Sequence, residues 1–161
     1  MSLRRGVRLG VDVGTVRIGV ARSDPEGILT VPVETLRRAD DGSEIHRLVE
    51  IARRFDAIEV VVGLPRHLRG GEGVSAKGAR RYARRIKGEL PEARVTMVDE
   101  RLSSNQAHSR LRESGVAERD HRDVVDQVAA QIILEQALDM ERMGGRPPGV
   151  QVEGPDRKAT S

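Results

Sequence analysis

The chain has 161 residues, 37% of them hydrophobic and 33% charged, a balance typical of one globular domain with its own core. It contains no Cys, which excludes disulfides, thiolate metal sites and cysteine nucleophiles, and its four scattered His do not indicate a zinc site. No apolar run reaches roughly 18 residues and no signal-peptide pattern is present, so we expect a cytoplasmic protein that does not enter the membrane. Any metal would be bound by oxygen ligands.

Residues 9–24 predict a β-hairpin whose first strand includes an acidic residue. Apolar residues alternate there with Gly10, Asp12 and Gly14. A carboxylate in a buried strand is costly unless it is paired or binds a cation. The alternative is that Asp12 stabilises the turn by accepting hydrogen bonds from the amides of Gly14 or Thr15.

The pattern Asp-x-Gly-Thr-x-x-x-Gly in this hairpin resembles two groups of proteins. One is the phosphate loop of the actin, hexokinase and heat-shock ATPases, and the other is the first strand of RNase H-like nucleases. The ATPases bind nucleotide between two such domains and need more than twice this length. An RNase H-like nuclease completes its site within one domain, which suits the length of this chain.

The remaining elements follow from hydrophobic periodicity and from turn residues. The order β-β-β-α-β-α-β-α-α predicts an α/β protein with an RNase H-like fold, in which a mixed five-stranded sheet has helices on both faces. Pro32 places the third strand at an edge or a bulge. We expect one domain over residues 1–143 and, because residues 144–161 are rich in Gly and Pro, a disordered C-terminal tail. The predicted elements after the hairpin are strand 28–36, helix 43–55, strand 57–64, helix 75–90, strand 93–98, helix 103–112 and helix 122–143.

Three acidic residues are candidates for one site. In this arrangement the first strand is central, so Asp12 lies near the end of the fifth strand, where Asp99 and Glu100 point to opposite sides if the strand continues. Asp126 lies one position from the apolar seam of the last helix, and small residues three and four positions later leave space around it. The alternatives are an ion pair with Arg101 for Glu100 and an ordinary surface acid for Asp126.

Basic residues are concentrated between residues 66 and 87, where there are eight Lys or Arg and one acid. Such a segment either binds a polyanion or forms a solvated helix face. The only aromatic residues are Phe55 and Tyr82, so we expect any nucleic acid to be bound through its phosphates and shape.

Four blocks resemble the YqgF or RuvX family, whose members are described as pre-16S rRNA nucleases and Holliday junction resolvases. They are LGVDVGTVRIGVARSD, VVGLP followed by GGEG, VDERLSSNQA and VVDQVAAQIILEQAL, in this order over residues 9–141. The resemblance implies an RNase H-like fold with site acids at Asp12, Glu100 and Asp126. The chain departs from the family at residues 66–69, where the family more usually has a polar, often Asn-containing segment.

Carboxylates without Cys or clustered His suit Mg²⁺ or Mn²⁺, and two such ions about 4 Å apart can hydrolyse a phosphodiester. Asp12 would bridge both metals, with Glu100 and Asp126 each binding one. Arg101 and Ser103 could contact the scissile phosphate, and the basic helix and loop would bind the flanking backbone. The residues expected to contact nucleic acid are Arg17, Arg66, Arg69, Arg80, Arg81, Arg84, Arg85, Arg101 and Ser103.

The resemblance therefore implies a metal-dependent nuclease that acts in the maturation of the 5′ end of 16S rRNA. A second hypothesis is a resolvase of four-way DNA junctions, which requires two active sites in a dimer. A third is a nucleic-acid-binding module without catalysis, which the presence of all three acids disfavours. The sequence leaves open whether the protein is a monomer or a homodimer.

Overall fold

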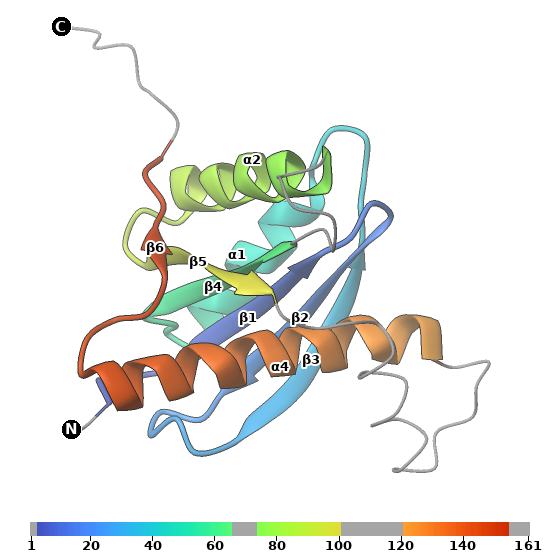
Figure 1. Ribbon diagram of the computed structural model, residues 1–161. Helices are drawn as coiled ribbons and strands as arrows, with labels where there is room; N and C mark the ends of the chain where they lie inside the picture. The colour runs from blue at the N-terminus through green and yellow to red at the C-terminus, as the bar shows by residue number, and fades with distance from the viewer. Residues whose placement is uncertain (1–2, 66–73, 101–120, 155–161) are drawn as a thin grey trace, which may run out of the picture.

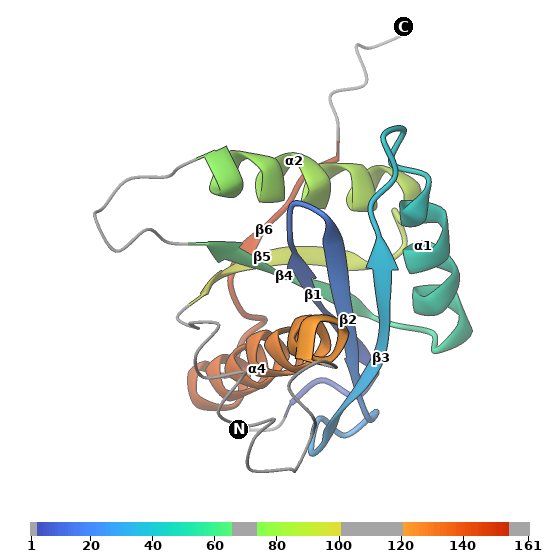
Figure 2. The same cartoon turned by 90° about the vertical axis from the view of Figure 1, so that its right-hand side faces the viewer.

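The computed structural model describes residues 3–65, 74–100 and 121–154. One mixed sheet forms the middle layer, with α1 and α2 on one face and α4 across the other (Figures 1 and 2). The strand order is β3-β2-β1-β4-β5-β6. The elements are β1 (Arg8–Val13), β2 (Arg17–Ser23), β3 (Thr30–Arg37), α1 (Glu44–Arg54), β4 (Glu59–Pro65), α2 (Val74–Glu89), β5 (Arg94–Glu100), α4 (His121–Gly144) and β6 (Val150–Gln151).

The first three strands form the predicted antiparallel meander. β1 lies inside the sheet, and β3 is an edge strand. Pro32 of β3 pairs with Ala21 where the register between β2 and β3 shifts, which confirms its predicted place at an edge or bulge, where a missing backbone N–H does no harm.

The carboxyl ends of β1, β4 and β5 lie at the same end of the sheet, because these three strands are parallel. β4 is buried on both faces from Glu59 to Leu64, as a strand between two helical layers must be. One core packs between the sheet and α1 and α2, and a second packs between the sheet and α4. α/β proteins commonly bind their ligands at the carboxyl ends of such parallel strands.

The sheet has six strands and not the five predicted from sequence. Residues 145–154, expected to be disordered, add β6 to the free edge of β5, where Val150 pairs with Met97. Val152 is buried against the main core, and its N–H donates a hydrogen bond of 2.7 Å to the carbonyl of Val95. The prediction of disorder is therefore wrong for these residues, because tertiary pairing outweighs the Gly and Pro content.

Several predicted segments lie outside the described residues. They are the loop 66–73, the helix expected at 103–112 and the last residues, 155–161. Among the described residues, no helix combines the length and apolar character needed to cross a membrane.

Candidate active site

Asp12 lies next to the last residue of β1 and is half-buried. Its partner across the β1–β2 pair is Gly19. The backbone closes the hairpin turn, with the Gly14 N–H donating to the carbonyl of Arg17 at 2.9 Å. One of the two amides that the turn interpretation assigned to Asp12, that of Gly14, is therefore bonded to the backbone.

Two glycines allow α4 to lie directly on the β1–β2 pair. A Cβ at Gly19 would collide with the carbonyl of Asp126 and lie 2.9 Å from its Cβ, and a Cβ at Gly10 would collide with the carbonyl of Ala130. Because Asp12 is on the same face of β1 as Gly10, this contact places Asp126 beside Asp12. Sequence reasoning identified the small residues of α4 but missed the glycines, although Gly inside a strand often marks a close backbone approach.

Asp126 forms an ion pair with Arg17, whose Nε lies 2.9 Å from Oδ2. The two side chains are 17% and 35% exposed, so the pair is partly shielded from water. Arg17 was predicted to contact nucleic acid, and the structure places it in the acidic site. The guanidinium therefore compensates the charge of this carboxylate in a charge-assisted hydrogen bond.

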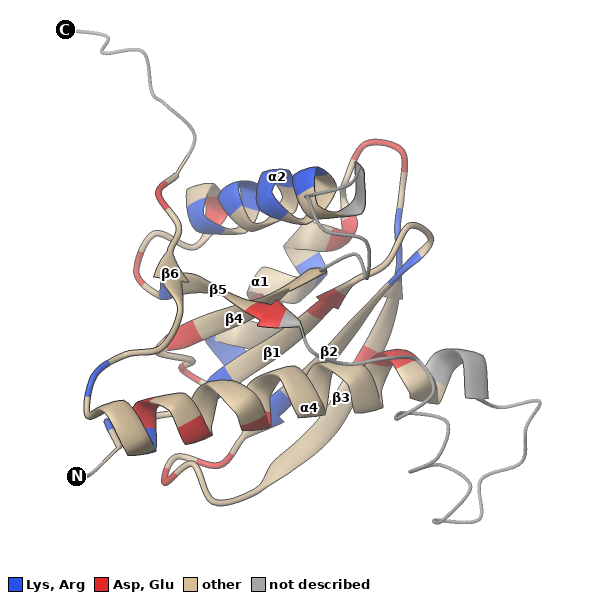
Figure 3. Ribbon diagram, in the orientation of Figure 1, with Lys and Arg blue, Asp and Glu red and all other residues tan. Residues whose placement is uncertain are grey.

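The register of β5 separates its two acidic residues. Val98 pairs with Gly63 and packs in the core under α4. Because residues alternate along a strand, Asp99 belongs to the opposite face, and position 100 belongs to the α4 face together with Asp12. Figure 3 shows acidic residues at the carboxyl end of β1 and on α4. The side chain of Glu100 is outside the described part of the chain.

The donor set of this site consists of carboxylates. Among the side chains that the structure describes, no three His, Asp or Glu are grouped closely enough to hold a metal ion. Asp12 and Asp126 supply two carboxylates on one face, and the position of Glu100 belongs to the same face. Carboxylate oxygens are the ligands preferred by hard divalent cations, so the residues fit Mg²⁺ or Mn²⁺.

The basic helix α2 lies on the other side of the sheet from Asp126. Its buried side is apolar and packs on β4 and β5. Figure 3 shows basic residues along α2, and Figure 2 shows the sheet between α2 and α4. Nucleic acid bound to both helices would therefore pass around an edge of the sheet. The exposed basic side chains of α2 are Lys77, Arg80, Arg81, Arg84 and Arg85.

The other residues predicted to contact nucleic acid cannot be placed. Arg66 and Arg69 precede α2, and Arg101 and Ser103 follow β5, all outside the described residues. The structure thus places Asp12, Arg17 and Asp126 together on the α4 face of the sheet. The arginines of α2 lie on the other face.

Comparison with known proteins gives three findings. The family model described as RuvX, Holliday junction resolvase, matches residues 6–140. A relative from Streptomyces coelicolor is 50% identical over 151 residues, covering 94% of this chain and 90% of its own, and is named "Putative pre-16S rRNA nuclease". A relative of the same name from Nocardia farcinica is 50% identical over 141 residues, covering 84% of this chain and 78% of its own.

Two solved structures are similar in fold. The first, Thermus thermophilus RuvC in complex with a Holliday junction, has a TM-score of 0.55 at 20% identity and covers 88% of this chain and 99% of its own. The second, Fowlpox virus resolvase with Holliday junction DNA, has a TM-score of 0.52 at 10% identity and covers 82% of this chain and 98% of its own. These likenesses confirm the predicted RNase H-like fold.

Proposed function

Because the chain belongs to the RuvX family, we propose that it is a metal-dependent nuclease that hydrolyses phosphodiester bonds during maturation of the 5′ end of pre-16S rRNA. One observation supports the active site above all others. Gly10 and Gly19 allow α4 to approach the sheet so closely that Asp126 lies on the same strand pair as Asp12. A substrate of this kind is found in the cytoplasm, where we place the protein.

We assign Asp12, Glu100 and Asp126 as ligands of Mg²⁺ or Mn²⁺. Asp12, on the inner strand β1, would be shared between two ions, and Glu100 and Asp126 would each bind one. The bound ions would activate water and stabilise the leaving oxygen of the phosphodiester.

Arg17 has a second role in this proposal. Without a metal ion, its guanidinium compensates the charge of Asp126. If Asp126 held a divalent ion, Arg17 would be free to bind a phosphate oxygen of the substrate.

The substrate backbone would be held mainly by phosphate contacts. Arg81 and Arg84 of α2 are exposed, and neither forms an ion pair within the described residues. Arg66 and Arg69 follow β4 in sequence, and Arg101 and Ser103 follow β5. Both segments therefore start at the carboxyl ends of the parallel strands. Contacts of this kind position a backbone without reading its sequence.

Cleavage of four-way DNA junctions is the second candidate function. It is favoured by the description of the family model, and two solved structures of the same fold contain such junctions. It requires two active sites in one assembly, and therefore a homodimer.

The test offers the full-length chain labelled precursor 16S rRNA and a synthetic four-way DNA junction in parallel, with Mg²⁺, Mn²⁺ or EDTA. We expect cleavage of the rRNA with either ion and none in EDTA. Asp12→Asn should abolish cleavage, whereas Asp99→Asn should retain it, because Asp99 is on the opposite face of β5. Cleavage in EDTA or by Asp12→Asn would disprove the metal site, and cleavage of the junction alone would favour the resolvase.

A further inference from the structure

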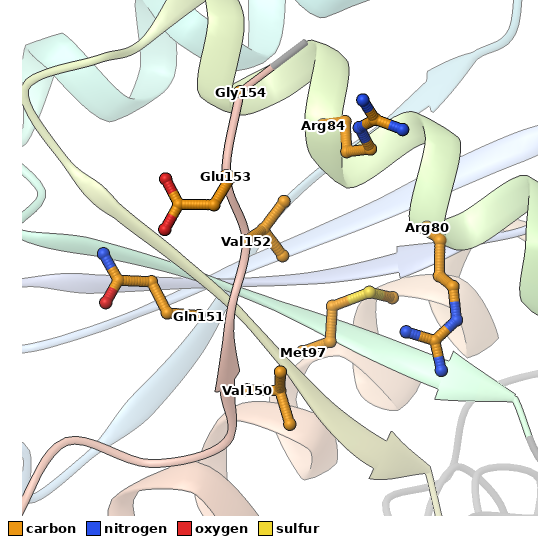
Figure 4. Close-up of a pocket in the computed structure, with 8 residues that line it drawn as sticks. All are labelled: Arg80, Arg84, Met97, Val150, Gln151, Val152, Glu153 and Gly154. Carbon is orange, nitrogen blue, oxygen red and sulfur yellow. The ribbon is translucent and has the colours of Figure 1, made fainter. Parts of the chain in front are cut away.

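A groove lies between α2 and the C-terminal strand β6. Its volume is about 260 Å³, and it is bounded by Arg80 and Arg84 from α2, Met97 from β5, and Val150 and Val152 from β6 (Figure 4). The family match ends at residue 140, so the β6 side of the groove is outside the matched region. The site described above uses none of its apolar residues.

The groove has an apolar floor and a basic rim. Val150 and Val152 are on the side of β6 that faces α2, whereas Gln151 and Glu153 point the other way (Figure 4). Val150 is 71% exposed, although it pairs with Met97 and forms part of the floor. The carboxylate of Glu153 is therefore directed away from the groove, and the exposed Arg84 places positive charge at the rim above the apolar floor.

This combination fits one unpaired nucleotide. A base taken out of its stack can pack on apolar side chains, and its phosphate pairs with Arg. The volume of about 260 Å³ is below the roughly 300–1,000 Å³ of pockets for drug-sized molecules, so the groove can hold one base, with its ribose and phosphate at the rim, and not a base pair.

The groove is also within reach of the proposed metal site. Met97 precedes Glu100 by three residues in β5, which corresponds to about 10 Å along the strand. The groove is on the α2 side of β5, so a nucleic acid strand would cross the β5 edge between the two positions.

We propose that this groove binds one unpaired nucleotide of a single-stranded RNA segment next to the cleavage position. The base packs against Met97 and Val150, and the phosphate binds Arg84. The proposal rests on the nuclease function proposed above and refines it, because the groove selects a substrate with an unpaired nucleotide beside the cleaved bond.

The test measures binding of the full-length chain in EDTA, where no metal-dependent cleavage occurs. The probes are a fluorescent single-stranded RNA and a blunt RNA duplex of equal length, compared by anisotropy. Arg84→Gln removes the charge at the rim, and Val150→Asp places a repelling charge on the floor at an exposed position. Arg81→Gln is the matched control, because it removes an equal charge from the same helix but lies outside the groove.

We expect Arg84→Gln and Val150→Asp to weaken binding of the single strand roughly tenfold while changing duplex binding much less. Arg81→Gln should weaken both probes equally. The groove proposal is overturned if Arg84→Gln and Val150→Asp affect the two probes equally.

The alternative occupant of the groove is the chain's own C-terminal segment, residues 155–161. A chain truncated after Gly154 tests this alternative. We expect its affinity for the single strand to be unchanged, and a selective increase would show that the tail fills the groove and would overturn the proposal. Failure of the proposed nuclease function would give a different result from failure of the groove proposal, because the wild-type chain would then neither bind nor cleave RNA. Wild-type cleavage without any preference for the single strand overturns the groove alone.

Discussion

At the scale of single residues, the candidate site depends on how charges are compensated before a metal ion binds. Asp12 and Asp126 lie on one face of the sheet, and like charges in a partly buried site repel each other. The guanidinium of Arg17 stabilises Asp126 at 2.9 Å. In the proposed site, Arg17 and a divalent ion would therefore compete for the same carboxylate.

Arg17→Gln should lower stability without metal and increase the response to metal. The ion pair is partly exposed, so its loss should cost about 1 kcal/mol in EDTA. Added Mn²⁺ should then stabilise the variant more than the wild type, because the ion no longer displaces a guanidinium. Thermal melts in EDTA and in Mn²⁺ measure both effects, and a smaller gain for the variant would contradict the competition.

Asp12→Asn should show the opposite pattern in the same melts. It removes one negative charge from the acidic face while keeping the shape of the side chain, so the variant should be at least as stable as the wild type in EDTA. It should gain less from Mn²⁺, since one ligand is lost. A variant that melts clearly lower in EDTA would return Asp12 to a structural role in the turn.

At the scale of elements, the C-terminal segment closes the edge of the sheet. The carbonyl of Pro148 accepts hydrogen bonds from Arg94 Nη1 at 2.8 Å and from Thr96 Oγ1 at 2.7 Å. Gly149 follows with a φ of 71°, and a Cβ there would collide with the carbonyl of Met97. An unpaired β5 would expose a strand edge, which proteins generally avoid.

Two truncations separate this segment from the residues beyond it. Ending the chain after Gly145 removes β6 and the buried Val152, which should cost about 2 kcal/mol of unfolding free energy and expose the β5 edge. Ending it after Gly154 keeps these contacts and should change stability little. Urea unfolding of both chains is the measurement, and equal stability would show that β6 contributes nothing.

Local patterns predicted the elements that have their own periodicity. Alternation across Gly10, Asp12 and Gly14 predicted the hairpin, and apolar spacing predicted α1, α2 and α4 within one or two residues at each end. β6 has only two residues, and its stability comes from pairing with β5, which no local pattern records. The contact of Gly19 with Asp126 is likewise tertiary, as is the ion pair of Arg17. The sequence thus predicted Asp12 and Asp126 as candidates, but not the contacts that place them together.

At the scale of the whole molecule, a buried charged cluster ties the N-terminal segment to the sheet and to the end of α4. Glu141 accepts hydrogen bonds from Arg4 Nη2 at 2.6 Å and from Arg8 Nη2 at 2.8 Å. Glu59 accepts from Arg4 at 3.0 Å and from Arg94 at 2.7 Å. The cluster therefore joins β1, β4, β5 and α4 at the end of the sheet opposite the candidate active site.

Stability should fall in acid because of Glu141. Burial raises the pKa of its carboxyl, but hydrogen bonds from Arg4 and the charge of Arg8 outweigh this and hold the pKa below the ordinary value of 4.5. A carboxyl with a depressed pKa in the folded state contributes its full stability above the unfolded pKa and loses it as the pH falls through the folded pKa. The contribution should therefore be complete near neutral pH and decline below about pH 4.5.

Glu141→Gln should cost about 3 kcal/mol of unfolding free energy at neutral pH, because Arg8 is buried and would lose its charged partner. The difference from the wild type should shrink as the pH is lowered, since protonation removes the same charge from the wild-type chain. Glu26→Gln is the matched control, because the ion pair between Arg5 and Glu26 is exposed and should contribute little. Urea unfolding across this pH range is the measurement. A cost that is independent of pH, or equal in the two variants, would show that the buried charge of Glu141 does not govern acid stability.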